Sequence, residues 1–175
     1  MYKIVLLNLP FTSTQYPSIA LTQLKYVLDE QFGERVTTEI HYLNHDFVRY
    51  LGPGLHDTLL KEYEHFTSGL AEWFFRQTAF PALADNSKEY FQRFYPRLQK
   101  QAPWFQHMLL KKRQGLDAFL NNLIEKYHLD QAHLVGLTSM FSQNLACISM
   151  ARKLKEQNAD IVTVMGGANC ETPMG

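Results

Sequence analysis

The chain has 175 residues, enough for a hydrophobic core, and we expect a single domain over residues 1–175. Its 17 basic and 17 acidic residues cancel, so the overall charge favours neither nucleic acid nor a membrane surface as a partner. The two cysteines, Cys147 and Cys170, form no metal-binding motif. Apolar stretches stay well below the ~18 residues of a membrane span. These features indicate a cytoplasmic protein without a disulfide bond.

Residues 1–43 have the pattern of a strand, a helix and a second strand. The apolar run over residues 2–8 predicts a buried strand, and Pro10 ends it because proline lacks a backbone donor. After Ser18, apolar residues recur three or four positions apart until Gly33, which predicts an amphipathic helix. Residues 36–43 alternate more strongly and predict a less buried strand.

Residues 44–114 form a long aromatic insertion after the second predicted strand. Four prolines interrupt it, so we expect several short helices. The aromatic residues are spaced three or four apart, which favours a role in the hydrophobic core. An insertion of this length is typical of a lid, a partner surface or a substrate channel.

The remaining residues return to alternating helices and strands. Helical periodicity over 116–127 is followed by a short apolar run at 133–137. Helical periodicity over 142–157 is followed by a second run at 160–165, and both runs predict buried parallel strands. The predicted fold class is therefore α/β, with a flavodoxin-like or Rossmann-like parallel sheet of about four strands and a large helical insertion after strand 2. Because the chain ends soon after a strand-end loop, we also expect a truncated domain.

Several common catalytic motifs are absent from the sequence. The loop after the first strand contains no glycine, which argues against a G-x-G-x-x-G dinucleotide site, and no Walker loop occurs. There is no G-x-S-x-G nucleophile elbow. The histidines lie at no spacing typical of metal ligands. The sequence therefore predicts neither catalytic residues nor a metal site.

Polar and small residues gather after the third and fourth predicted strands. Thr138, Ser139, Ser142 and Gln143 follow one strand, and the pair Gly166-Gly167 ends the other. Each residue alone is ordinary turn or cap chemistry. The carboxyl ends of neighbouring parallel strands meet at one edge, where α/β proteins bind ligands. We therefore expect a site for a large polar ligand, with free N–H groups of the following helix available to a phosphate.

Two blocks of sequence resemble a known family. The first is Val-Gly-Leu-Thr-Ser-Met-Phe-Ser-Gln-Asn at 135–144, and the second is Val-Met-Gly-Gly-Ala-Asn-Cys-Glu-Thr-Pro-Met-Gly at 164–175. Together with Leu9-Pro-Phe and Tyr42-Leu-Asn, they resemble the amino-terminal cobalamin-binding domain of radical S-adenosylmethionine enzymes. The resemblance is to the family that methylates carbon in ribosomally made, modified peptides, and it covers the whole chain.

This resemblance implies a cobalamin with its corrin over the strand ends and its nucleotide tail beside the sheet. It places the loop after the first strand at the corrin and the polar residues after the third strand at the tail and the corrin amides. The glycine pair and its neighbour would make room for the tail. The implied cobalamin-binding residues are Pro10, Phe11, Thr138, Ser139, Ser142, Gln143, Gly166, Gly167 and Ala168.

The chain departs from related cobalamin proteins in two respects. The loop after the first strand lacks the D-x-H-x-x-G motif of the methionine synthase type, which implies a base-off cobalamin without a histidine ligand from the protein. No C-x-x-x-C-x-x-C motif occurs, so the chain cannot hold a 4Fe–4S cluster for cleaving S-adenosylmethionine. A parent enzyme would have to supply the radical S-adenosylmethionine barrel and bind the peptide substrate.

Two other functions stay open at this point. The chain could be a non-catalytic interaction module that retains no cofactor and self-associates through an exposed sheet edge. It could also be a flavodoxin-like protein that binds another phosphate-bearing ligand.

Overall fold

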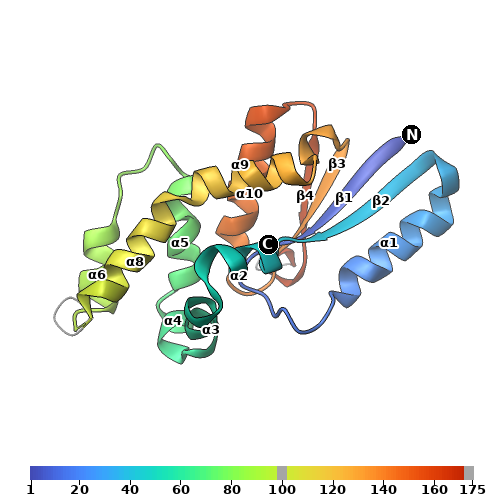
Figure 1. Ribbon diagram of the computed structural model, residues 1–175. Coiled ribbons are helices and arrows are strands. Elements are labelled where there is room, and N and C mark those ends of the chain that lie inside the picture. The colour runs from blue at the N-terminus through green and yellow to red at the C-terminus, as the bar shows by residue number, and fades with distance from the viewer. Residues whose placement is uncertain (98–101, 172–175) are drawn as a thin grey trace.

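A four-stranded parallel sheet forms the centre of the molecule. The computed structural model describes residues 1–97 and 102–171 (Figure 1). The strand order is β2-β1-β3-β4, and every neighbouring pair is parallel. This confirms the predicted α/β class and Rossmann-like sheet, whereas the truncation expected at Gly175 lies outside the described residues. The strands are β1 Tyr2–Asn8, β2 Val36–Tyr42, β3 Leu134–Thr138 and β4 Val162–Gly166.

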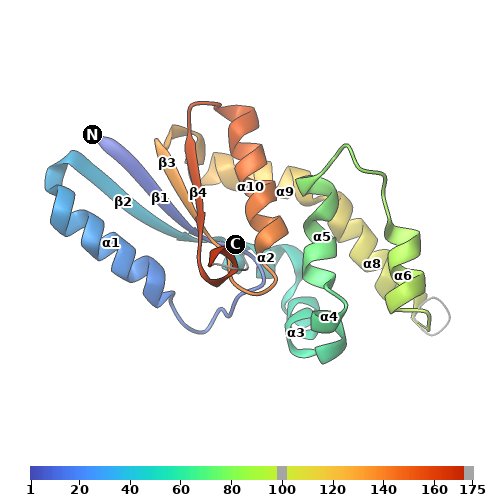
Figure 2. The ribbon, with the colours of Figure 1, turned by 180° about the vertical axis from the view of Figure 1, so that it is seen from behind.

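Helix α1, Ile19–Phe32, connects β1 to β2. It begins where predicted, because the Ser18 hydroxyl accepts a hydrogen bond from the Leu21 amide. It ends at Gly33, whose positive φ of 52° is a conformation that glycine adopts readily. Helix α10, Asn144–Gln157, connects β3 to β4. Figures 1 and 2 show α1 on one side of the sheet and α10 on the other.

The insertion is helical, as predicted, and a further helix, Leu116–Lys126, follows it and returns the chain to the sheet. Short 3-10 turns lie at Gly33–Arg35, Leu129–Gln131 and Ala168–Cys170. The helices between β2 and β3 are α2 Leu43–Leu51, α3 Pro53–Lys61, α4 Tyr63–Thr67, α5 Leu70–Ala79, α6 Ser87–Phe94, α8 Pro103–Gln114 and α9 Leu116–Lys126.

Aromatic side chains of the insertion join the core of the sheet. The rings of Phe47, Phe74 and Phe75 are fully buried, and Phe47 lies 5.6 Å from Phe75 between ring centroids. Phe11, in the loop after β1, packs edge-on against Phe47 at 5.0 Å. These rings belong to one apolar cluster with the β1 residue Val5 and with side chains of β3 and α10. The predicted role of the aromatic residues in the core is confirmed.

Two ion pairs, each with one buried partner, link segments of the insertion to one another and to α9. The guanidinium of Arg113 stacks over the Trp73 ring at 4.3 Å, and Arg113 Nη1 donates to Asp85 Oδ1 at 2.5 Å. Asp46 on α2 accepts a hydrogen bond of 2.6 Å from Lys126 at the end of α9. Both pairs link segments far apart in the sequence, so they set how the insertion folds back onto the sheet.

The other face of the sheet is poorly covered. The buried cluster on this face contains only Ile4, Leu6 and Leu21 among the described residues. Helix α1 covers this face at β2. Val162 and Val164 on β4 are 47% and 49% exposed. The prediction of a buried strand at 160–165 is therefore wrong, because β4 lies at the edge of the sheet and no described helix covers this face of it.

We expect Phe47→Ala to lower the free energy of unfolding by about 3–5 kcal/mol, because it opens a cavity among buried rings. Phe66, which is 57% exposed on α4, provides a matched control. Phe66→Ala should change the free energy of unfolding by no more than about 0.5 kcal/mol. Urea unfolding followed by circular dichroism measures both, and equal losses would contradict an aromatic core centred on Phe47.

Candidate functional site

A groove runs along the poorly covered face of the sheet. The chain passes from β1 to β2 in one direction and from β3 to β4 in the other, so the topological switch point lies between β1 and β3. Ligands of open α/β sheets bind at this point, beyond the carboxyl ends of the strands. Here a groove of about 850 Å³ lies between α1 and strands β1, β3 and β4. It lies on the side of the sheet that carries α1, and Figure 2 shows this arrangement of helix and strands.

The floor and walls of this groove are mainly apolar. Ile4 and Leu6 on β1 and Leu134 on β3 form part of the floor. Leu24 and Val27 on α1 form part of the wall, although both are exposed. The groove extends from the amino ends of the strands at Ile4 to their carboxyl ends, so it is suited to a long ligand with an apolar part.

Glycines on β3 and β4 give the groove its depth. A Cβ atom added at Gly136 would lie 2.8 Å from Leu6 Cδ2, whereas one added at Gly166 would meet nothing within 4 Å. Gly166 therefore leaves open a space that a larger side chain would fill. Gly167 has a different role, because its φ is 115° and an added Cβ would lie 2.4 Å from the Ser139 carbonyl oxygen. A side chain at Gly167 would disturb the backbone itself.

Asn8 is a candidate site residue that the sequence analysis did not single out. It ends β1 beside Thr138 and Gly166, at the carboxyl edge of the groove. Its Oδ1 atom accepts a hydrogen bond from Thr12 Oγ1, and its NH₂ group has no hydrogen-bond acceptor among the residues that the structure describes. The sequence contained a signal for this residue. Asn8 follows Ile4 and Leu6 at every second position, so its side chain is expected on the same face of the strand.

Six of the nine implied cobalamin-binding residues line the groove, and the other three lie outside its lining. The Phe11 ring points into the aromatic core, and the Thr138 hydroxyl donates to the Leu7 carbonyl at 3.3 Å. The residues that line the groove are Phe11, Thr138, Ser139, Gln143, Gly166 and Gly167, and those outside it are Pro10, Ser142 and Ala168.

Gln143 uses its polar atoms within the protein. It is fully buried, and Nε2 donates to the carbonyls of Leu9 at 2.8 Å and Pro10 at 3.1 Å. Its Oε1 atom accepts from the Met140 amide at 3.1 Å. Gln143 thus ties the loop after β3 to the loop after β1, and its contact with a ligand stays a prediction.

Ser139 likewise joins two loops. Its hydroxyl donates to Asn144 Oδ1 at 2.6 Å and accepts from Asn169 Nδ2 at 3.0 Å. The same Asn169 amide donates to the Phe141 carbonyl at 2.8 Å. These bonds hold the loop after β3 against the 3-10 turn after β4, so the loops at the carboxyl edge form a single connected unit.

The start of α10 is occupied by a carboxylate of the insertion. Glu72 on α5 accepts hydrogen bonds from the amides of Asn144 at 3.0 Å and Leu145 at 2.8 Å. The prediction of free N–H groups for a phosphate is therefore wrong for these two amides. A negative group from α5 already lies where a phosphate would bind, which disfavours a flavodoxin-like phosphate site here.

Among residues 1–97 and 102–171, no cluster of three or more His, Cys, Asp or Glu side chains could hold a metal ion. Within the same residues, no helix has the length and apolarity needed to cross a membrane. The chain matches no protein-family model, no curated protein and no solved structure.

We expect Glu72→Ala to lower the free energy of unfolding by about 1–2 kcal/mol, because the amides of Asn144 and Leu145 lose their acceptor. Glu125, exposed on α9, is a matched control whose replacement by alanine should change this free energy by no more than about 0.5 kcal/mol. Chemical unfolding of the two variants measures the difference, and equal effects would contradict a capping role for Glu72.

The pH dependence of this loss has a defined sign. Burial raises the pKa of the Glu72 carboxyl above its ordinary value of 4.5, and the two backbone hydrogen bonds do not offset the effect of burial. A carboxyl with a raised folded-state pKa stabilises the fold most when it is protonated, and this contribution falls as the pH rises through that pKa. The loss caused by Glu72→Ala should therefore shrink as the pH rises from 4.5. A loss that grows with pH would contradict this.

Proposed function

We propose that the chain is the cobalamin-binding module of a radical S-adenosylmethionine methyltransferase that acts on a ribosomally made peptide. One observation carries the proposal. A long, mainly apolar groove opens at the topological switch point, and described residues from both blocks that resemble this family line it. The parent enzyme, rather than this chain, would hold the iron–sulfur cluster and the peptide.

The chemistry of the groove fits the two parts of cobalamin. Cobalamin combines a flat corrin, which carries amide side chains, with a nucleotide tail that ends in an aromatic base. The apolar strip from Gly166 to Leu134 suits the aromatic end of the tail, and the open space at Gly166 admits a bulky group. The NH₂ group of Asn8 at the carboxyl edge suits an amide oxygen of the corrin.

Exposed side chains at the carboxyl edge would shield the bound cofactor from water. Phe141 is 70% exposed and adopts a positive φ of 54°, which is an uncommon conformation for an aromatic residue. Asn169 holds this conformation through its bond to the Phe141 carbonyl. Met140 and Tyr16 are also exposed and line the same groove. Their role in this proposal is to cover the corrin.

Bound cobalamin would supply a cobalt atom that relays a methyl group from S-adenosylmethionine to the substrate carbon. No histidine is among the described residues that line the groove, which supports binding without a histidine ligand from this chain. In this proposal, the residues of this chain bind and orient the cobalamin and exclude water from it.

The apolar surface also supports a second candidate, a non-catalytic interaction module. Ile19 and Leu24 on α1 expose apolar side chains, and so do Val162 and Val164 on the edge strand β4. Surfaces of this kind mark protein interaction sites. In this case the chain should self-associate in analytical ultracentrifugation, Val164→Lys should reduce the association, and cobalamin should have no effect.

An absorbance titration with hydroxocobalamin and, separately, methylcobalamin tests the leading proposal. The wild-type chain should give a saturable spectral change. Gly166→Leu fills the groove without a backbone clash, so it should weaken binding by about tenfold or more, equivalent to about 1.4 kcal/mol.

Ala159→Leu provides the control, because it adds the same side chain on the exposed turn between α10 and β4. It should bind cobalamin like the wild type, and both variants should keep the wild-type circular dichroism spectrum. A flat titration with the folded wild-type chain would contradict the proposal. Equal binding by Gly166→Leu and the wild type would place cobalamin outside the groove.

A further inference from the structure

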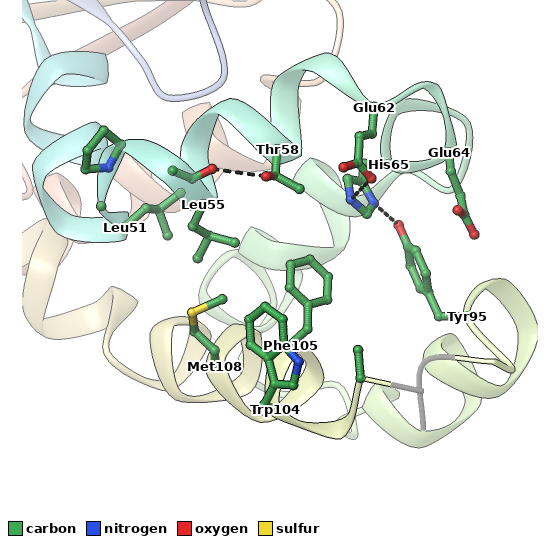
Figure 3. A pocket seen from close by; sticks show the side chains of 14 residues that line it. Leu51, Leu55, Thr58, Glu62, Glu64, His65, Tyr95, Trp104, Phe105 and Met108 are labelled. Atoms are coloured by element: carbon green, nitrogen blue, oxygen red, sulfur yellow. Dashed lines mark hydrogen bonds and ion pairs between the residues drawn. The ribbon is translucent and has the colours of Figure 1, made fainter. Parts of the chain in front are cut away.

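The helical insertion contains a cavity that is separate from the groove. It has a volume of about 560 Å³ and lies between α3 and α4 on one side and the start of α8 on the other (Figure 3). None of the described residues that line it also lines the groove. A volume of this order is typical of sites for small molecules.

One part of the cavity is apolar and aromatic. Leu55 on α3 and Phe105 and Met108 on α8 form much of the wall, as Figure 3 shows. Trp104, at the start of α8, also lines the cavity and is 66% exposed. An apolar ligand body can pack on Leu55 and Phe105, and the Trp104 ring adds an aromatic face on which a ligand ring can stack.

The opposite part is polar and fixed by hydrogen bonds. His65 on α4 is buried, and its Nδ1 atom lies 2.8 Å from the Tyr95 hydroxyl, which in turn lies 2.7 Å from Ser68 Oγ. The other ring nitrogen, Nε2, lies 3.0 Å from Glu62 Oε2 (Figure 3). The Glu62 carboxylate thus lies beside the buried imidazole at the cavity.

The described side chains that line the cavity carry a negative charge. Burial lowers the pKa of His65 below 6.5, and the neighbouring carboxylates of Glu62 and Glu64, which raise it, do not offset this. His65 is therefore neutral at neutral pH. Among the described residues that line the cavity, the charged side chains are Glu62 and Glu64. The cavity combines this negative end with the apolar wall of α3 and α8.

We propose that the cavity binds a small organic cation, namely a primary amine on an aromatic body. The ammonium group lies against the carboxylates of Glu62 and Glu64, and the aromatic body lies between Leu55, Phe105 and Trp104. Opposite charge at one end and apolar contact at the other select an amine over a neutral or acidic molecule with the same ring. This site is independent of cobalamin binding.

Calorimetric titration of the whole chain with 2-phenylethylamine tests the proposal, with 3-phenylpropanol and 3-phenylpropionate as neutral and acidic counterparts. The amine should bind saturably, and the other two should bind about fivefold more weakly or worse. Selective excitation of tryptophan should show a saturable change with the amine. Trp104→Phe keeps an aromatic ring at the cavity and should abolish this change, because Trp73 is buried elsewhere in the core.

Conservative variants test the charge. Glu62→Gln and Glu64→Gln should each weaken amine binding by about twofold to fivefold, because both carboxylates are exposed and partly screened by water. Glu34→Gln, on the exposed turn after α1, is the matched control and should bind like the wild type. No saturable amine binding by the folded chain would overturn the proposal. Equal binding of the amine, the alcohol and the carboxylate would overturn it as well.

Discussion

The two faces of the sheet are covered unequally, and the functional site follows from this asymmetry. In most α/β proteins, helices bury both faces of a parallel sheet. Here α5, α9 and α10 lie on one face, whereas α1 is the one described helix on the other face and packs against β2 (Figures 1 and 2). Strands β3 and β4 are left with an uncovered apolar surface, and that surface meets the carboxyl edge where α/β sheets bind ligands.

The insertion takes part in building this edge. Phe11, in the loop after β1, enters the aromatic cluster around Phe47, and Glu72 on α5 binds the first turn of α10. Both loops that border the groove are therefore held by residues of the insertion. The hydrogen bonds of Gln143 and Asn169 then connect these loops to each other. A segment outside the sheet thus gives the groove a defined shape.

Much of the fold could be predicted because its signals are local. The run from Tyr2 to Asn8, the cap at Ser18 and the glycine at 33 each act through neighbouring residues, and each matches the structure. The exposure of β4 could not be predicted, because an apolar run does not reveal whether another element covers it.

The site was less predictable because its contacts join distant segments. A polar residue after a strand has the same appearance in the sequence whether it binds a ligand or another loop. Ser139 and Gln143 illustrate this, because their side chains hold neighbouring loops together. Glu72 lies 72 residues before Asn144, in a helix whose other residues suggest only core packing. The glycine pair was recognised, but its two members have different roles that only the geometry separates.

A ligand in the uncovered groove would bury apolar surface that a helix buries in most α/β proteins. Apolar surface that leaves water when a ligand binds lowers the heat capacity of the complex relative to its free components. A ligand that binds only the folded chain also shifts the folding equilibrium in proportion to its supply. The resistance of this domain to heat and to proteolysis would then report how much ligand is present. Ligand supply, as well as sequence, would set how long the folded chain survives.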